Sequence, residues 1–357
     1  MHLNDKIDCH SIFSKCFAMT VLVWIATNRR AILAMTSKKH STQDSAESAM
    51  ILWAILLFFS HFKDSAIIRR FYKTLRIKMT LGYEVPQGSK IHFGSNARLK
   101  RDIEKIAVEI FYENGYEEIS TPSFNFTDDE KILSKRKIIR TSTDNNKQMI
   151  LRNDNTIDVI KIINRHLKLS NKKWFYIQSA FSYPSTQIEQ IGAEYIGKDN
   201  ENIADVLRVA VSILVKLQLN PILQIANMKI PRLCAEESGL NIEVFSQMQV
   251  QKILDSSAYL RDLLYIQDKN SLIAYIAKSP SFLKDELQKL LDSASFGEYE
   301  NMIFSPLYYP KIGYYESLFF RAFSDNKVFL RGGKYIIDDI YSSGFAIYTN
   351  EIIDFML

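Results

Sequence analysis

The sequence is poor in cysteine and lacks the residue spacings of a zinc site. Three of its 357 residues are cysteines, Cys9, Cys16 and Cys234. So few cysteines in a chain of this length do not make a disulfide framework, and no pair of cysteines or histidines has the short spacing of zinc ligands. We therefore expect no metal, no cofactor and a reducing, cytoplasmic environment.

No apolar run is long enough to cross a membrane. The two longest, residues 17–26 and 49–62, fall short of the roughly 20 residues that a spanning helix needs. Neither run has the flanks of a secretory signal. The second is followed by a cluster of lysines and arginines, so a basic segment lying on a membrane surface stays a minor alternative.

Outside the N-terminal region, the chain also lacks excess positive charge. The net charge is +5, but residues 1–78 hold 12 Lys+Arg against 5 Asp+Glu, and the remaining residues hold 33 against 35. A nucleic-acid-binding domain usually has a basic surface. We therefore expect neither a nucleic acid nor a membrane as partner.

The same break in composition divides the chain. We expect residues 1–78 to be an N-terminal extension without a role in function, disordered or translated from a misassigned start. Residues 79–357 are expected to form one domain, with a helical insertion at about residues 231–291, where strand signals are few.

Periodicity in the body predicts a mixture of helices and strands. Apolar residues recur at three- and four-residue spacing in residues 95–114, and Gly115 follows as a helix stop. Further helices are expected at 156–167, capped by Asn155 or Thr156, and at 202–217. Strands are expected at 117–120, 148–152, 174–182, 189–196, 223–226, 302–309, 315–324 and 327–330, and residues 332–339 and 343–357 read as strand, turn and helix. This order indicates an α+β domain.

Two acidic segments carry candidate ligand-binding residues. In Leu151-Arg-Asn-Asp-Asn-Thr156, Asp154 and Thr156 stand where a strand gives way to a helix, so they either cap the helix or bind a ligand. Gln190 and Glu194 lie four apart on a strand and therefore share one face. They either bind a ligand with an imidazole and an ammonium group or line a solvated sheet face.

Two later segments complete the set. Gly313-Tyr-Tyr315 supplies Tyr314 and Tyr315, which are either ligand-binding or core tyrosines. In Gly332-Gly-Lys-Tyr335, the paired glycines allow a ligand to approach the backbone closely.

In this order, across roughly residues 90–355, these segments resemble the catalytic core of histidyl-tRNA synthetase. The resemblance implies a class II antiparallel sheet flanked by helices. It implies that Asp154 and Thr156 hold the amino group of histidine, that Gln190 and Glu194 contact histidine, and that a tyrosine of the 314–315 pair reaches its ring. Residues 95–122 resemble motif 1, which builds a dimer interface in that fold, although an ordinary helix, turn and strand would look the same.

The arginines of adenylation are missing from this pattern. Joining a carboxylate to a phosphate accumulates negative charge that fixed cations must stabilise. At the three matching positions the chain has Ser182, Pro310 and Ile352. Neighbouring Lys311 lacks the bidentate fork of arginine, and we expect no anticodon-binding domain after residue 357.

The chain is therefore identified as a member of the synthetase's non-catalytic relatives, the regulatory subunits of ATP phosphoribosyltransferase. The resemblance implies assembly with a short-form catalytic subunit, and feedback control by histidine of the first step of histidine biosynthesis. Two alternatives stay open: a truncated histidyl-tRNA synthetase or other histidine-activating ligase, and a stand-alone module that senses histidine or tRNA.

Overall fold

The computed structural model describes residues 85–126, 137–167, 172–197, 202–297, 299–310 and 315–357. The extension at residues 1–78 and the candidate Tyr314 lie outside these ranges, so the expectations for them stay predictions.

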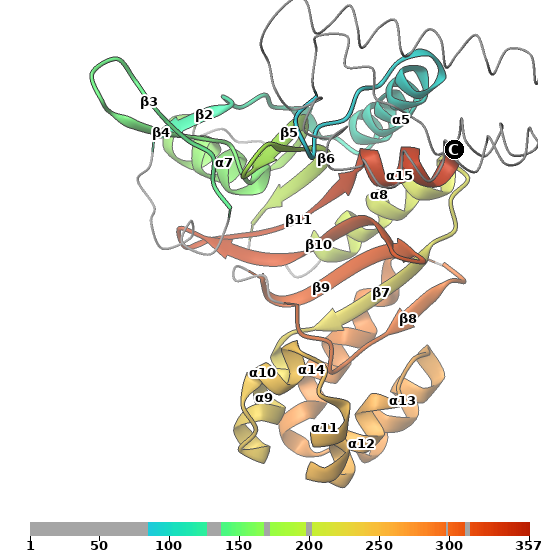
Figure 1. The fold of residues 1–357 in the computed structure, drawn as a ribbon. Coiled ribbons are helices and arrows are strands. Elements are labelled where there is room, and N and C mark those ends of the chain that lie inside the picture. The colour runs from blue at the N-terminus through green and yellow to red at the C-terminus, as the bar shows by residue number, and fades with distance from the viewer. Residues whose placement is uncertain (1–84, 127–136, 168–171, 198–201, 298, 311–314) are drawn as a thin grey trace, which may run out of the picture. The chain divides into compact units, whose positions relative to one another are not determined.

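An eight-stranded sheet forms the centre of the described part (Figure 1). Its strands in spatial order are β1 (Glu117–Glu118), β5 (Lys173–Ser182), β6 (Thr186–Ile196), β11 (Ile340–Tyr348), β10 (Lys327–Ile337), β9 (Tyr315–Ser324), β7 (Ile222–Asn227) and β8 (Met302–Phe304). The six central strands pair antiparallel, whereas β1 pairs with β5 and β8 with β7 in parallel. The expected antiparallel sheet flanked by helices is confirmed, with short parallel strands added at both edges.

Three helices cover one face of this sheet. They are α5 (Gly94–Glu113), α8 (Asn202–Lys216) and α15 (Thr349–Met356), and α8 and α15 contact the sheet and α5. Alternate residues of the strands point toward these helices and join the main core, including Phe345, Ile347 and Leu330. The other set of alternate residues faces away from the three helices, and this set builds the site described below.

The opposite face carries α7 (Asn155–Ile162) and a small sheet. Strands β2 (Phe124–Phe126), β4 (Gln148–Leu151) and β3 (Arg140–Ser142) form that sheet. Helix α7 packs on β5, β6 and β10, and a π-helical turn, η1 (Ile163–Leu167), follows it. Of the caps considered for α7, the structure selects Asp154, whose carboxylate accepts the backbone N–H of Ile157; Asn155 and Thr156 are the first two residues of the helix.

Residues 229–292 contain six helices joined by short connections. Helices α9 (Lys229–Ser238), α10 (Ile242–Ser246), α11 (Val250–Ser256), α12 (Ala258–Leu264), α13 (Lys269–Lys278) and α14 (Ser281–Asp292) lie between β7 and β8 in the sequence, followed by the 3₁₀ turn η2 (Ser293–Phe296). Figure 1 shows them gathered below the β7–β8 edge of the sheet. Within the described ranges, no helix has the length and apolar character of a membrane span.

Several predicted strands differ in extent from the observed ones, most clearly β10 and β8. Strand β10 runs without interruption from Lys327 to Ile337, through the paired glycines. The glycines stay in the strand because both pair with residues of β11 on one side and of β9 on the other. Strand β8 is shorter than expected and ends at Phe304.

Candidate functional site

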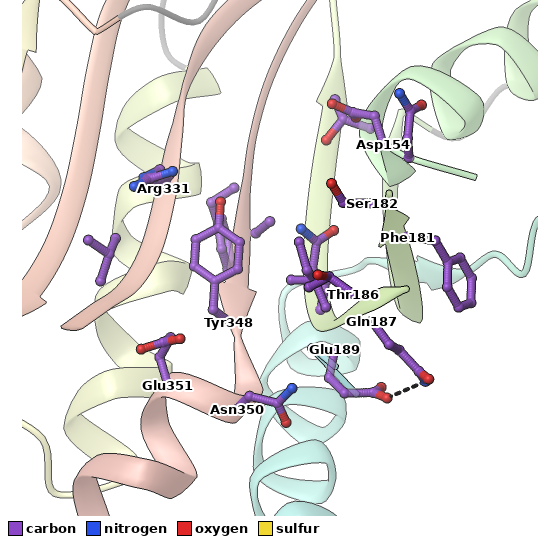
Figure 2. Close-up of a pocket in the computed structure, with 18 of the residues that line it drawn as sticks. Asp154, Phe181, Ser182, Thr186, Gln187, Glu189, Arg331, Tyr348, Asn350 and Glu351 are labelled. Atoms are coloured by element: carbon purple, nitrogen blue, oxygen red, sulfur yellow. Dashed lines mark hydrogen bonds between the residues drawn. The ribbon is translucent and has the colours of Figure 1, made fainter. Parts of the chain in front are cut away.

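A cavity of about 710 Å³ opens on the face of the sheet that carries α7. Side chains from β5, β6, β10 and β11 form its floor, and the first residues of α7 and α15 stand at its rim (Figure 2). Of the sequence candidates, Asp154, Thr156, Gln190 and Tyr315 line this cavity. The structure therefore brings together residues that are up to 161 positions apart in the sequence.

The backbone that carries Asp154 is anchored by Arg152, two residues before it. Arg152 is buried and donates to the carbonyl oxygens of Thr121, at 2.7 Å, and Ser179, at 3.0 Å. This arginine ties the end of β4 to strand β5. Asp154 then caps α7 while its side chain reaches the cavity wall, so capping and a ligand role are compatible at this residue.

Glu194 lies beneath the cavity floor. Its side chain is fully buried, accepts a hydrogen bond of 2.7 Å from Thr156 Oγ1 and accepts a second from the hydroxyl of Tyr335. Burial raises the pKa of Glu194 to about 8, although these hydroxyl donors oppose the shift. The alternative of a solvated sheet face is wrong for this residue, which is screened from the cavity by Thr156 and Tyr335.

Two glycines make room for this buried cluster. A Cβ on Gly344 would lie 1.8 Å from Glu194 Oε2, and a Cβ on Gly192 would lie 2.2 Å from the ring of Tyr176. The Tyr176 hydroxyl in turn lies 3.4 Å from Thr156 Oγ1. Backbone from β6 and β11 thus approaches the carboxylate and phenol closely enough to exclude water.

Gln190 lies on the cavity floor, four residues before Glu194 on β6. Its Oε1 accepts a hydrogen bond of 2.7 Å from Asn155 Nδ2, which leaves its amide N–H₂ group for other contacts. Tyr315 is buried against Phe319 and Tyr335 and also lines the cavity. It is both a core tyrosine and a wall residue.

The positions expected to need arginine lie in three different surroundings. Ser182 lines the cavity and offers only a neutral hydroxyl. Pro310 is buried. Ile352 lies in the main core with no exposed surface, whereas its predecessors in α15, Asn350 and Glu351, line the cavity. The position matched to the third arginine is therefore a core position in this structure, and the residue before it brings a carboxylate to the cavity.

Sequence reasoning missed the cations that do line the cavity. They are Lys90, Lys137 and Arg331. Lys90 forms an ion pair with Asp354, while the guanidinium carbon of Arg331 lies 5.7 Å from the centre of the Tyr348 ring. The period-2 spacing of Arg331, Gly333 and Tyr335 could have identified Arg331, because alternate strand residues share a face. No group of metal-ligating side chains is found among the residues that the structure describes.

Comparison with known proteins places this chain in a family. The family model of histidyl-tRNA synthetase matches residues 94–352. The ATP phosphoribosyltransferase regulatory subunit of Helicobacter hepaticus is 50% identical over 281 residues, which cover 78% of this chain and 100% of that protein. The same subunit of Wolinella succinogenes is 47% identical over 279 residues, with coverages of 78% and 97%.

Solved structures show the same fold at lower identity. An ATP phosphoribosyltransferase regulatory subunit/histidyl-tRNA synthetase of Bacillus halodurans aligns with a TM-score of 0.68 at 16% identity, covering 76% of this chain and 83% of that one. A chain of the ATP phosphoribosyl transferase (HisG:HisZ) complex of Thermotoga maritima aligns with a TM-score of 0.59 at 15% identity, covering 70% and 97%. The chain has a class II fold, and its cavity has Ser182 where a cation was expected. About half of its aligned residues are identical to those of two regulatory subunits, whose lengths the alignments cover almost completely. The chain therefore belongs to the family of ATP phosphoribosyltransferase regulatory subunits.

Proposed function

We propose that this chain is the non-catalytic regulatory subunit of an ATP phosphoribosyltransferase and works by assembling with a short-form catalytic subunit in the cytoplasm. The observation that carries the proposal is the 50% identity to such a subunit over that protein's full length. The complex would join ATP to phosphoribosyl pyrophosphate, and histidine would inhibit this first step of histidine biosynthesis.

The cavity chemistry supports a regulatory rather than a catalytic role. Adenylation requires fixed cations at the reacting phosphate, whereas Ser182 is neutral and Glu351 would repel a phosphate. Losing one such stabilising group typically costs an enzyme about 100–1000-fold in rate. A regulatory subunit needs only different affinities for a ligand in two states, so these residues do not impair it.

We further infer that Asp154, Thr156, Gln190, Glu194, Tyr315 and Tyr314 form the place where this subunit would bind histidine. Asp154 and the Thr156 hydroxyl suit an ammonium group, which needs a carboxylate and a neutral acceptor. The free amide hydrogens of Gln190 suit a carboxylate or ring nitrogen. Glu194 would act through Thr156 and Tyr335, whose hydroxyls it holds in position.

Self-association through α5 is part of the same proposal. The helix leaves Tyr112 56% exposed, and its neighbour α8 leaves Val215 57% exposed. These apolar side chains would be covered when two copies meet along α5. Light scattering on the purified chain, compared with a Tyr112→Glu variant, tests this: the variant is expected to have half the mass of the wild type.

Reconstitution tests the main proposal. The purified chain is mixed with a short-form catalytic subunit, and phosphoribosyl-ATP formation is measured with and without histidine. We expect the mixture to be active and sensitive to histidine, and the catalytic subunit alone to be nearly inactive. Equal activity with and without this chain would overturn the proposal.

Pyrophosphate exchange tests the enzyme alternative. A truncated histidyl-tRNA synthetase or another histidine-activating ligase would exchange labelled pyrophosphate into ATP when histidine is present. We expect no histidine-dependent exchange above the background of a no-protein control. Exchange at the rate of an ordinary synthetase would replace the regulatory proposal with the enzymatic one.

A further inference from the structure

Asn153 has a buried amide group for which the described part of the chain provides no partner. The residue lies between β4 and α7 and lines the cavity. Its Nδ2 atom is shielded from solvent and donates no hydrogen bond to any described residue. Buried polar groups are nearly always hydrogen-bonded, because an unpaired donor destabilises the folded state. Asn153 therefore calls for an acceptor from outside these residues.

Two further donors lie beside Asn153. The residue before Ser182 donates its backbone N–H to the carbonyl oxygen of Arg152 at 2.8 Å, and the residue after Ser182 donates to that of Lys137 at 2.9 Å. Ser182 therefore lies between the backbone segments that carry Lys137 and Asn153. The side chains of all three residues line the cavity, so they face the same space.

The three side chains offer donors without a negative charge. The hydroxyl of Ser182 and the ammonium group of Lys137 form no hydrogen bond or ion pair with other described residues. An amide, a hydroxyl and an ammonium group can all donate to one anionic group. Hydrogen bonds to an ionised acceptor are the stronger ones. This set of donors therefore suits a carboxylate.

Asp154 brings the opposite chemistry to the same place. It follows Asn153 in the chain, and its carboxylate lines the same cavity. Figure 2 shows Asp154 and Ser182 at one end of the cavity, on the side away from Arg331. In an α-amino acid, one carbon carries both the ammonium group and the carboxylate. An acceptor and donors that lie next to each other therefore fit the two charged groups of one such molecule.

We propose that Asn153, together with Ser182 and Lys137, binds the carboxylate of an α-amino acid whose ammonium group meets Asp154. This inference rests on the proposed histidine pocket for the position of the ammonium group, and it assigns the carboxylate to residues outside the set given above. It also makes the carboxylate a requirement for tight binding, because a ligand that lacks it leaves the Asn153 amide unpaired.

Calorimetry with two ligands tests the assignment, on the full-length chain and on its complex with the catalytic subunit. L-Histidine carries the carboxylate, whereas L-histidinol has the same ring and ammonium group without it. We expect Asn153→Ala to weaken histidine binding roughly tenfold or more, the effect of one charge-assisted hydrogen bond. Asn153→Asp should weaken it further, because its charge repels the carboxylate. Neither variant should weaken histidinol binding.

Asn241→Asp is the matched control. Asn241 is exposed, caps α10 and lies outside the cavity. Aspartate caps a helix as well as asparagine does, so the control gains the same charge as Asn153→Asp and keeps its local structure. We expect it to bind histidine with the affinity of the wild type. A loss of affinity equal to that of Asn153→Asp would assign the effect to net charge and overturn the subsite.

Melting temperatures without ligand separate binding from structure. Asn153→Ala is expected to melt at or above the temperature of the wild type, because it removes an unpaired buried donor. A clearly lower melting temperature, together with equal losses of histidine and histidinol affinity, would make Asn153 a structural residue and overturn the proposal.

A panel of the common L-α-amino acids distinguishes this inference from the histidine proposal. If the wild type binds another amino acid and Asn153→Ala weakens that binding, the carboxylate subsite stands and the histidine assignment fails. If histidine binds the wild type and both Asn153 variants equally, the subsite is overturned and the histidine assignment stands. If no amino acid binds the chain or the complex, the subsite is overturned, and activation of the catalytic subunit still tests the regulatory role by itself.

Discussion

Asp154 combines a local structural role with a position in the cavity. Its carboxylate caps α7 by accepting the N–H of Ile157 at 3.1 Å, and it also lines the cavity wall. A carboxylate has about four acceptor sites, so capping a helix and pairing with an ammonium are compatible. Because asparagine caps helices as well as aspartate does, the two roles can be separated by substitution.

We predict that Asp154→Asn keeps the stability of the chain and weakens histidine binding. The cap hydrogen bond survives, while the charge that would pair with the ammonium is lost, an effect of about 10–100-fold for a charge-assisted hydrogen bond. Calorimetry on the reconstituted complex measures the affinity and thermal melting measures stability. Asp154→Ala is the contrasting variant, which should lose both; unchanged affinity in both variants would remove Asp154 from the pocket.

Glu194 should make stability depend on pH near neutrality. Its pKa is raised from an ordinary 4.5 to about 8 by burial, so between these values the folded state holds a proton that the unfolded state releases. Its contribution to stability is therefore complete below about pH 4.5 and is lost as pH rises through about 8. At 1.36 kcal/mol per pKa unit, the full range is on the order of 5 kcal/mol.

We predict that Glu194→Gln flattens the fall in unfolding free energy between pH 6.5 and 8.5. Glutamine is neutral throughout and keeps an acceptor for Thr156. Urea denaturation at several pH values gives the slopes, and the upper window avoids Asp158, whose pKa burial raises to about 6. Exposed Glu243 in α10 provides the control, Glu243→Gln, which should behave as the wild type. Identical slopes for wild type and Glu194→Gln would show that Glu194 ionises normally.

At the scale of elements, helix α15 decides which residue meets the cavity. The helix starts at Thr349 immediately after β11, and successive residues turn by about 100°. Glu351 therefore reaches the cavity while Ile352 and Ile353 enter the core. A one-residue error in matching a motif on a helix exchanges a core position for a cavity position.

We predict that Ile352→Arg destabilises the chain by more than about 4 kcal/mol, because it buries an unpaired charge in a packed core. It should not create histidine-dependent pyrophosphate exchange. Met356→Arg is the control on the same helix, at a position that is 43% exposed, and should leave the melting temperature nearly unchanged. A stable Ile352→Arg protein with exchange activity would show that position 352 does reach the cavity.

The difference between local geometry and long-range contacts explains which features could be predicted from the sequence. Period-2 spacing correctly put Gln190 and Glu194 on one face of β6, because strand geometry is local. It could not show that Glu194 is buried, since Tyr335 and Gly344, which close over it, lie on strands more than 140 residues away. The sequence could not choose the cap of α7, because three adjacent residues, Asp154, Asn155 and Thr156, are all good caps.

At the scale of the whole chain, charge is distributed unevenly. Residues 1–78 carry an excess of 7 positive charges, 12 Lys+Arg against 5 Asp+Glu, and the remainder is close to neutral. The match to the family model starts at residue 94. Both observations support our proposal that residues 79–357 contain what assembly with the catalytic subunit requires.

We predict that deleting residues 1–78 leaves the activation of a short-form catalytic subunit unchanged. The cavity, α5 and the sheet all lie after residue 84, so the deletion removes none of the residues to which we assign a role. The full-length and Met79-start chains are titrated into the same catalytic subunit, and the concentration for half-maximal activation is compared at two salt concentrations. Electrostatic attraction by the basic extension would weaken with salt, so the two chains would then differ most at low salt. Matching curves at both salt concentrations support the prediction, and a Met79-start chain that is insoluble or fails to activate would give the extension a function.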